Sequence, residues 1–128
     1  MTVLKINDKE LNVKYGYEAT LKTRLLSRMA KIEKQKDKDE MEATEDLLLF
    51  LPEFLLVGLQ KYHSDEYGFD YLDDNAKQKQ IDKVFGVIEE YFDCNEDVDA
   101  IILYNILTEE MLKNGFLKQQ FQKEMAKK

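Results

Sequence analysis

Apolar and polar residues follow one another in blocks along the chain, and the most apolar block covers residues 47–59, LLLFLPEFLLVGL. Ten of these 13 positions are large apolar residues, and they point in every direction around a helix. A helix without a polar face belongs in a protein interior. The block is also shorter than the roughly 20 apolar residues that a membrane span requires. We therefore predict a central helix over residues 41–63, surrounded by the rest of the chain.

Two features of this central helix stay open at the level of sequence. Pro52 lacks a backbone N–H, so the helix either kinks at this point or divides into two helices. The other helices either cover the apolar surface completely or leave one side uncovered. In the second case, the uncovered side is a binding surface for another chain.

The first 15 residues show the two-residue period of β-strands. The apolar positions that share a face are Leu4 and Ile6 in the first run, and Leu11, Val13 and Tyr15 in the second. Between the runs, Asn7, Asp8 and Lys9 supply turn residues. We predict a β-hairpin over residues 2–15, which must pack against helices because an isolated hairpin is marginally stable in water.

The period changes to that of a helix after Gly16. The predicted helices after the hairpin, besides the central one, are 17–33, 75–92, 96–113 and a short C-terminal helix over 116–126. A charged linker over residues 34–40 separates the first of them from the central helix. Residues 64–74 are expected to form a loop held to the core by Phe69, Tyr71 and Leu72.

Together these elements predict a single domain over residues 1–128 that is mainly α. The N-terminal β-hairpin would pack on a bundle of four to five helices around the apolar central helix. The chain has one proline and five glycines, so few residues interrupt helices. It opens without a cationic start followed by an apolar run, so we expect no signal peptide and a soluble, cytosolic protein.

Charge is distributed in blocks along the chain. The net charge is −7, which argues against binding nucleic acid through phosphate contacts. Residues 65–99 hold 12 acids and three lysines, whereas residues 113–128 hold five lysines and one glutamate. These blocks are either solvated helix faces or surfaces that steer one copy onto another. For the second case we assign self-association to Asp93, Glu96 and Asp97 on one copy and to Lys118 and Lys123 on the next.

The sequence holds no recognisable catalytic, cofactor or metal site. Residues 93–99, DCNEDVD, resemble the start of a calcium loop, but Val98 and Tyr104 replace the required glycine and bidentate glutamate. His63 is the only histidine and Cys94 the only cysteine, which argues against zinc and against an internal disulfide. Nucleophilic catalysis by Cys94 would need His63 as its base. We therefore predict that the protein is not an enzyme and binds no cofactor.

The order of these features resembles the tail assembly chaperones of long-tailed bacteriophages, especially phages of Gram-positive bacteria. The resemblance covers most of the chain and rests on five features. They are the hairpin VLKINDKEL (3–11), KYGY (14–17), the end of the central helix VGLQKYH (57–63), the helix 75–92 within the acidic block 65–99, and the lysine-rich end EMAKK (124–128).

The resemblance implies a non-enzymatic protein of the host bacterial cytoplasm that takes part in virion morphogenesis and is absent from the mature virion. Such chaperones bind the tape measure protein, keep it soluble and deliver it during assembly of the tail tube. It also implies a homo-oligomer, since one small subunit covers little of a long client, and a longer frameshifted form of the chain as a further partner. No membrane or nucleic acid partner is implied.

A tape measure protein is a long helix with apolar stripes, so its chaperone needs an apolar groove. We assign this groove to leftover faces of the central helix and to the C-terminal segment. The residues assigned to client binding are Leu48, Phe50, Leu51, Leu55, Phe116, Leu117 and Phe121. An alternative function is that of an acidic inhibitor or DNA mimic, in which residues 65–99 occupy the nucleic-acid-binding cleft of a host protein.

Overall fold

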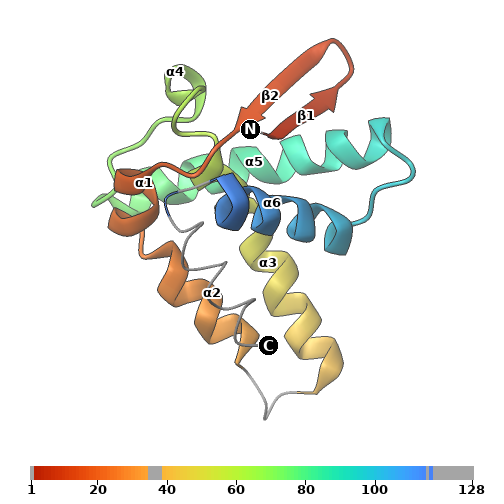
Figure 1. The fold of residues 1–128 in the computed structure, drawn as a ribbon, viewed down its shortest axis with the longest axis horizontal. Coiled ribbons are helices and arrows are strands. Elements are labelled where there is room, and N and C mark those ends of the chain that lie inside the picture. The colour runs from red at the N-terminus through yellow and green to blue at the C-terminus, as the bar shows by residue number, and fades with distance from the viewer. Residues whose placement is uncertain (1, 35–38, 115, 117–128) are drawn as a thin grey trace.

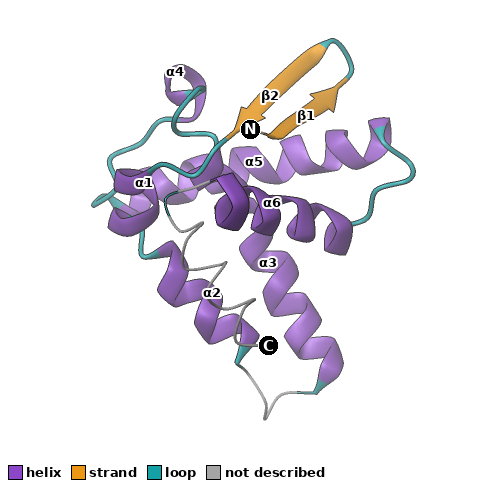
Figure 2. Ribbon diagram, in the orientation of Figure 1, coloured by secondary structure: helices purple, strands orange, loops and turns teal. Residues whose placement is uncertain are grey.

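The structure is a computed structural model that describes residues 2–34, 39–114 and 116 (Figure 1). Two strands open the chain, and helices form the rest of its regular structure (Figure 2). The elements are β1 (Thr2–Ile6), β2 (Lys9–Val13), α1 (Tyr17–Lys22), α2 (Leu25–Glu33), α3 (Glu40–Gly58), α4 (Ser64–Tyr67), α5 (Asp74–Cys94) and α6 (Ala100–Asn114). The predicted fold class, mainly helical with an N-terminal hairpin, is confirmed.

The hairpin pairs β1 with β2 in antiparallel register, with Leu4 opposite Leu11 and Ile6 opposite Lys9. The turn between the strands is short, and Asn7 adopts a left-handed φ of 53° that asparagine tolerates. The apolar face predicted from the two-residue period is buried, as expected. It packs on α5 and α6 and against the end of α3.

The C-terminal half of α3 is the centre of the fold. Every residue from Phe50 to Gly58 is buried, including Pro52 and Glu53. The helix is continuous through Pro52, so a division into two helices is wrong. It ends at Gly58, before the predicted His63, and Asp39 caps its start by accepting a hydrogen bond from the Glu42 N–H.

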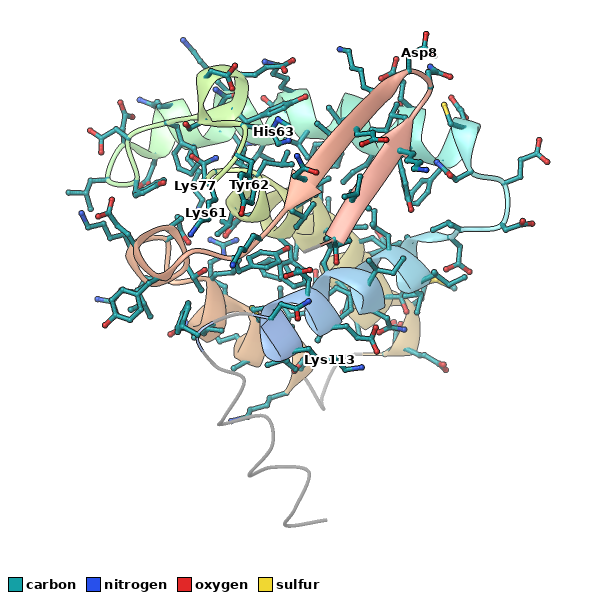
Figure 3. The ribbon with its side chains drawn as sticks, turned by 45° about the horizontal axis from the view of Figure 1, so that its top comes forward. Asp8, Lys61, Tyr62, His63, Lys77 and Lys113 are labelled. Carbon is teal, nitrogen blue, oxygen red and sulfur yellow. The ribbon has the colours of Figure 1, made fainter. Side chains whose placement is uncertain are left out.

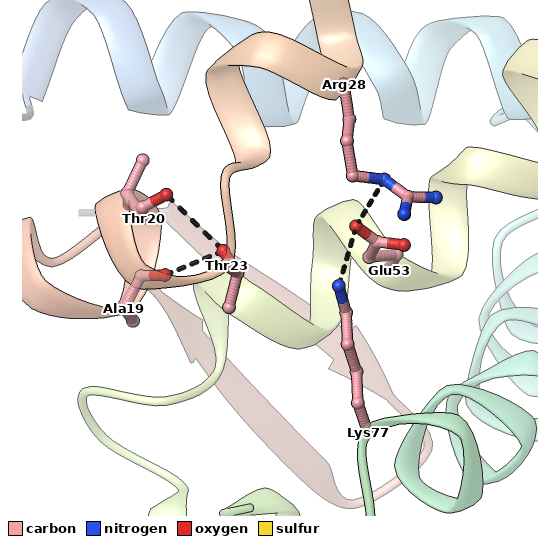
Figure 4. A network of polar contacts seen from close by, with 6 residues as sticks. All are labelled: Ala19, Thr20, Thr23, Arg28, Glu53 and Lys77. Atoms are coloured by element: carbon pink, nitrogen blue, oxygen red, sulfur yellow. Dashed lines mark hydrogen bonds and ion pairs between the residues drawn. The ribbon is translucent and has the colours of Figure 1, made fainter. Parts of the chain in front are cut away.

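The predicted helix over 17–33 is wrong, because the chain breaks into α1 and α2. The Thr23 hydroxyl donates hydrogen bonds to the carbonyls of Ala19 and Thr20, at 2.7 and 3.3 Å, and so satisfies acceptors at the end of α1 (Figure 4). Arg24 then takes a left-handed φ of 58° and begins α2 in a new direction. In one continuous helix Leu21 would share the face of the buried Leu25, but after this break it is exposed.

The segment between α3 and α5 also differs from the prediction. It contains the short helix α4, whose Tyr67 is buried. The side-chain amide of Gln60 donates hydrogen bonds to the carbonyls of Leu56 and Tyr67. Phe69 and Tyr71 pack on the core as expected, but Leu72 is 84% exposed. The predicted helix over 96–113 starts later, at Ala100, because Asp99 caps it by accepting from the Ile102 N–H.

The remaining boundaries differ by small amounts or lie outside the described residues. Helix α5 extends the predicted 75–92 by a residue at its start and two at its end. Lys34, Asp39 and Glu40 of the charged linker 34–40 are described, and its centre is not. The short helix 116–126 lies outside the described residues except for Phe116.

In space, α5 and α6 run across the molecule beneath the hairpin (Figure 1). Helix α3 packs against both of them and against α2. The N-terminal half of α3 lies beside α2, and the two extend away from the hairpin (Figure 1). Helix α1 and the loop between α5 and α6 lie at opposite ends of the longest axis.

Two helical glycines should respond in opposite ways to replacement by alanine. A Cβ atom at Gly58 would lie 2.7 Å from Val13 Cγ1 and 2.9 Å from Tyr15 Cζ, and both side chains are buried. Gly86 in α5 has no atom within 4 Å of such a Cβ. We expect Gly58→Ala to lower the free energy of unfolding by about 1–3 kcal/mol through overpacking. Gly86→Ala should raise it by up to about 1 kcal/mol through helix propensity.

Urea unfolding followed by circular dichroism measures both changes. Equal effects of the two substitutions would contradict the close packing of β2 on the end of α3.

Candidate functional site

A buried ionic contact joins three helices. Glu53 in α3 is buried, and its Oε2 lies 2.9 Å from Arg28 Nε in α2 and 3.2 Å from Lys77 Nζ in α5 (Figure 4). These are ion pairs formed at one oxygen of the carboxylate. Two cations compensate one buried acid, and the three side chains link α3 to α2 and α5.

The only histidine has a structural hydrogen bond. His63 Nε2 accepts a hydrogen bond from the Asn12 N–H at 2.9 Å, and the Lys14 N–H donates to the Gly58 carbonyl at 3.0 Å. Both contacts hold the outer edge of β2 to the end of α3. Figure 3 shows His63 and Tyr62 near the base of the hairpin and Asp8 at its tip.

The exposed cysteine lies in another part of the fold from His63. Cys94 ends α5, and its Sγ lies 3.1 Å from Asn7 Oδ1 in the hairpin turn. Asn95 donates from the same end of α5 to the Lys5 carbonyl at 2.9 Å. The structure therefore does not bring Cys94 and His63 together as nucleophile and base.

Among the described residues, no group of three or more His, Cys, Asp or Glu side chains could hold a metal ion. None of the described helices is both long and apolar enough to cross a membrane.

The predicted client groove is not a surface in this structure. Phe50, Leu51 and Leu55 are each no more than 3% exposed, because they lie in the half of α3 that is buried in the core. The prediction that they remain uncovered is wrong. Leu48 is half-buried, and Phe116 is partly exposed. Leu117 and Phe121 lie outside the described residues.

An apolar surface does exist on α3, one turn before the predicted groove. Met41 is 70% exposed and Leu49 is 62% exposed, and they share one face of the helix with Glu45 and Leu48. We call this face the α3 seam. It lies on the part of α3 that extends from the body beside α2 (Figure 1). Positions 41, 45, 48 and 49 have the spacing with which one helix packs along another.

A second apolar surface surrounds the break between α1 and α2. A hollow of about 450 Å³ is lined by Thr20, Leu21, Lys22, Arg24, Leu26, Ser27 and Leu72. We call it the α1 hollow. Its leucines come from three segments, and the charged residues that line it are both cations. Beside it, the Tyr17 ring contacts Phe116 edge-on, with ring centroids 5.1 Å apart.

The residues assigned to self-association divide into two groups. Asp93, Glu96 and Asp97 are exposed and line the turn that follows α5, with no cation among its lining residues. We call these three acids the acidic tip. Their assigned partners, Lys118 and Lys123, lie outside the described residues.

Comparison with models of protein families, with curated proteins and with solved structures finds no match to this chain. Its function is therefore argued from the surfaces described above.

Loss of the buried acid should destabilise the fold without affecting the exposed surfaces. Glu53→Gln keeps the size of the side chain but leaves Lys77, which is largely buried, without its countercharge. We expect a loss of roughly 2–3 kcal/mol in the free energy of unfolding. Glu45→Gln, exposed on the same helix, is the matched control and should change it by less than about 0.5 kcal/mol. Equal stabilities in urea titrations would contradict the role of Glu53.

Stability should fall in alkaline solution because two buried tyrosines resist ionisation. Burial raises the pKa of Tyr15, whose hydroxyl donates to the Phe54 carbonyl. Burial also raises the pKa of Tyr104, whose hydroxyl donates to Glu33 Oε1 at 2.8 Å. Unfolded tyrosine loses its proton near pH 10. Both groups therefore contribute fully to the free energy of unfolding below about pH 10, and this contribution is lost as the pH rises above it.

The urea midpoint, followed from about pH 8 to about pH 11, should decrease, and Tyr104→Phe should decrease less steeply than the unchanged protein. Identical slopes for the two proteins would contradict this assignment.

Proposed function

We propose that the protein is a phage tail assembly chaperone that binds the tape measure protein, keeps it soluble and delivers it during tail tube assembly. The observation that carries the proposal is the α3 seam, an exposed apolar stripe on a helix whose C-terminal half is buried. Isolated exposed leucines are ordinary, but a stripe with helical spacing is what a second amphipathic helix recognises.

The geometry of the seam fits a long helical client. Met41 and Leu48 are seven residues apart, so they define a line about two turns long on the helix surface. A client helix lying along this line would cover Met41, Leu48 and Leu49 with its own apolar stripe. Since α2 and this part of α3 extend from the body, a long client can pass without meeting the hairpin (Figure 1).

Charge at the seam favours a particular kind of client segment. Glu45 lies between Met41 and Leu49 on the exposed face, and the first turn of α3 adds Glu40 and Glu42. A client helix with a lysine or arginine beside its apolar stripe would pair with Glu45. We expect such segments of the tape measure protein to be bound in preference to acidic ones.

One subunit contacts a few turns of helix, so solubilising a long client requires several copies. The proposed assembly acts as a homo-oligomer in the host cytoplasm, with a frameshifted longer form as a further component, and is absent from the mature virion. None of these steps needs a catalytic group, in keeping with a binding function rather than an enzymatic one.

A second candidate function is the acidic inhibitor or DNA mimic of a host nucleic-acid-binding protein. The observation that favours it is on α5, where Asp82, Glu89 and Asp93 are exposed at i, i+7 and i+11 and therefore form a line along one face. A complex held by these charges should weaken steeply with salt, whereas a complex held by the apolar seam should persist.

Substitution of the seam should abolish client binding without unfolding the protein. Met41→Asp with Leu49→Asp removes the apolar stripe at two exposed positions. We expect the tape measure protein, co-expressed with this variant, to precipitate, whereas the unchanged chain should co-elute with it in a soluble complex at high salt. Phe85→Asp, an exposed apolar position on α5, is the matched control and should retain the client.

Circular dichroism separates this result from unfolding, because the seam variant should keep its helical signal. By contrast, Leu51→Asp and Leu55→Asp introduce a charge into the core and should lose it. A soluble complex with the seam variant would contradict the proposed site.

A further inference from the structure

The two ends of the molecule differ in charge and both expose apolar side chains. Helix α1 lies at one end of the longest axis, and the loop between α5 and α6 lies at the other (Figure 1). The α1 hollow belongs to the first end and the acidic tip to the second. Surfaces at opposite ends of one molecule can meet only when two copies stand head to tail.

The α1 hollow is an apolar depression with a cationic rim. Leu21 and Leu72 are exposed, and Leu26 lies half-buried between them and the core. Lys22 and Arg24 supply the charges of the lining, and Lys22 also forms a solvent-exposed ion pair with Glu18 in α1 at 3.9 Å, which the acids of a second copy would have to replace. The acids of the neighbouring loop accept hydrogen bonds from backbone N–H groups. Asp70 accepts from the Leu72 N–H, and Asp73 accepts from the N–H groups at the start of α5.

The opposite end carries the complementary features. The acidic tip projects three carboxylates from the turn after α5. Ile101 and Ile102, in the first turn of α6, are both exposed next to this turn. The turn itself is held in place, because the Asn95 side chain donates to the Lys5 and Tyr91 carbonyls and Asp99 caps α6.

We propose that the acidic tip of one copy, with Ile101 and Ile102, docks in the α1 hollow of a second copy. The isoleucines would cover Leu21 and Leu72, and Glu96 and Asp97 would pair with Lys22 and Arg24. Complementary charges around an apolar contact steer the two copies together and fix their register. This replaces Lys118 and Lys123 as the acceptors of the acidic tip.

The contact is heterologous, since it uses a different surface on each partner. Each copy retains a free hollow or a free tip, so the contact repeats and generates an open chain or a closed ring. The α3 seam takes no part in it and stays available on every copy. The inference rests on the homo-oligomer of the proposed function but uses a different surface from the client. Loss of self-association with client binding retained, or the reverse, therefore distinguishes the two.

Charge reversal tests the contact in the full-length protein. One variant carries Lys22→Glu and Arg24→Glu, and the other carries Glu96→Lys and Asp97→Lys. Each variant places like charges on both sides of the contact. We therefore expect sedimentation analysis to give a dissociation constant at least roughly tenfold larger than that of the unchanged protein. An equimolar mixture of the two variants restores opposite charges where a reversed hollow meets a reversed tip and should associate again.

Two sets of variants distinguish loss of this contact from a general effect of charge or of unfolding. Lys31→Glu and Glu45→Lys reverse exposed charges away from both surfaces, and these variants should associate like the unchanged protein. Leu72→Asp, at a loop position that cannot disturb the core, should weaken association as strongly as the charge reversals. Circular dichroism should show the same melting behaviour for all of these proteins.

A chain that sediments as a monomer at high concentration and low salt would overturn the proposal. It would also be overturned if the two reversed variants associated normally alone, or failed to associate when mixed.

Discussion

The burial of the C-terminal half of α3 is the constraint on which the other elements depend. From Phe50 to Gly58 this helix has no exposed side, so the hairpin, α2, α5 and α6 must each cover part of it. Gly58 allows β2 to approach closely enough for the Lys14 N–H to reach its carbonyl. The one charge in this segment, Glu53, is retained because Arg28 and Lys77 reach it from two different helices.

The same constraint explains where the surface remains apolar. Helices α2, α5 and α6 all pack on α3, and the N-terminal half of α3 lies beside α2, away from the hairpin. Met41 and Leu49 stay exposed there for lack of a covering element among the described residues. The proposed client would occupy the position that a further helix would take in a larger bundle.

The sequence predicted those parts of the fold that follow from periodicity. The hairpin face and the apolar middle of α3 are buried as their patterns indicate, and so are Ile81, Val84 and Ile88, which have helical spacing on one face of α5. The break at Thr23 and Arg24 was not predicted. It depends on a side-chain hydrogen bond and a left-handed backbone, and neither feature changes the spacing of apolar residues. This break alone decides that Leu21 faces outward and that the α1 hollow exists.

The candidate site was predicted less well for a related reason. An apolar helix shows that a surface must be covered, but the covering elements are distant in the sequence. Phe50, Leu51 and Leu55 were therefore assigned to a groove although the fold buries them in the core. The charged linker that precedes α3 marks the part of this helix that the other helices do not reach. The exposure of Met41 and Leu49 could have been predicted from their position in that part.

Hydrogen exchange along α3, with and without the tape measure protein, tests the central claim most directly. In the free protein, the amides of residues 50–58 should exchange slowly and those of residues 41–49 faster, since the first group is buried and the second is not. The account predicts that the client slows exchange at residues 41–49 and leaves α5 unchanged. Protection along the acidic face of α5, with none at residues 41–49, would contradict it and favour the acidic inhibitor.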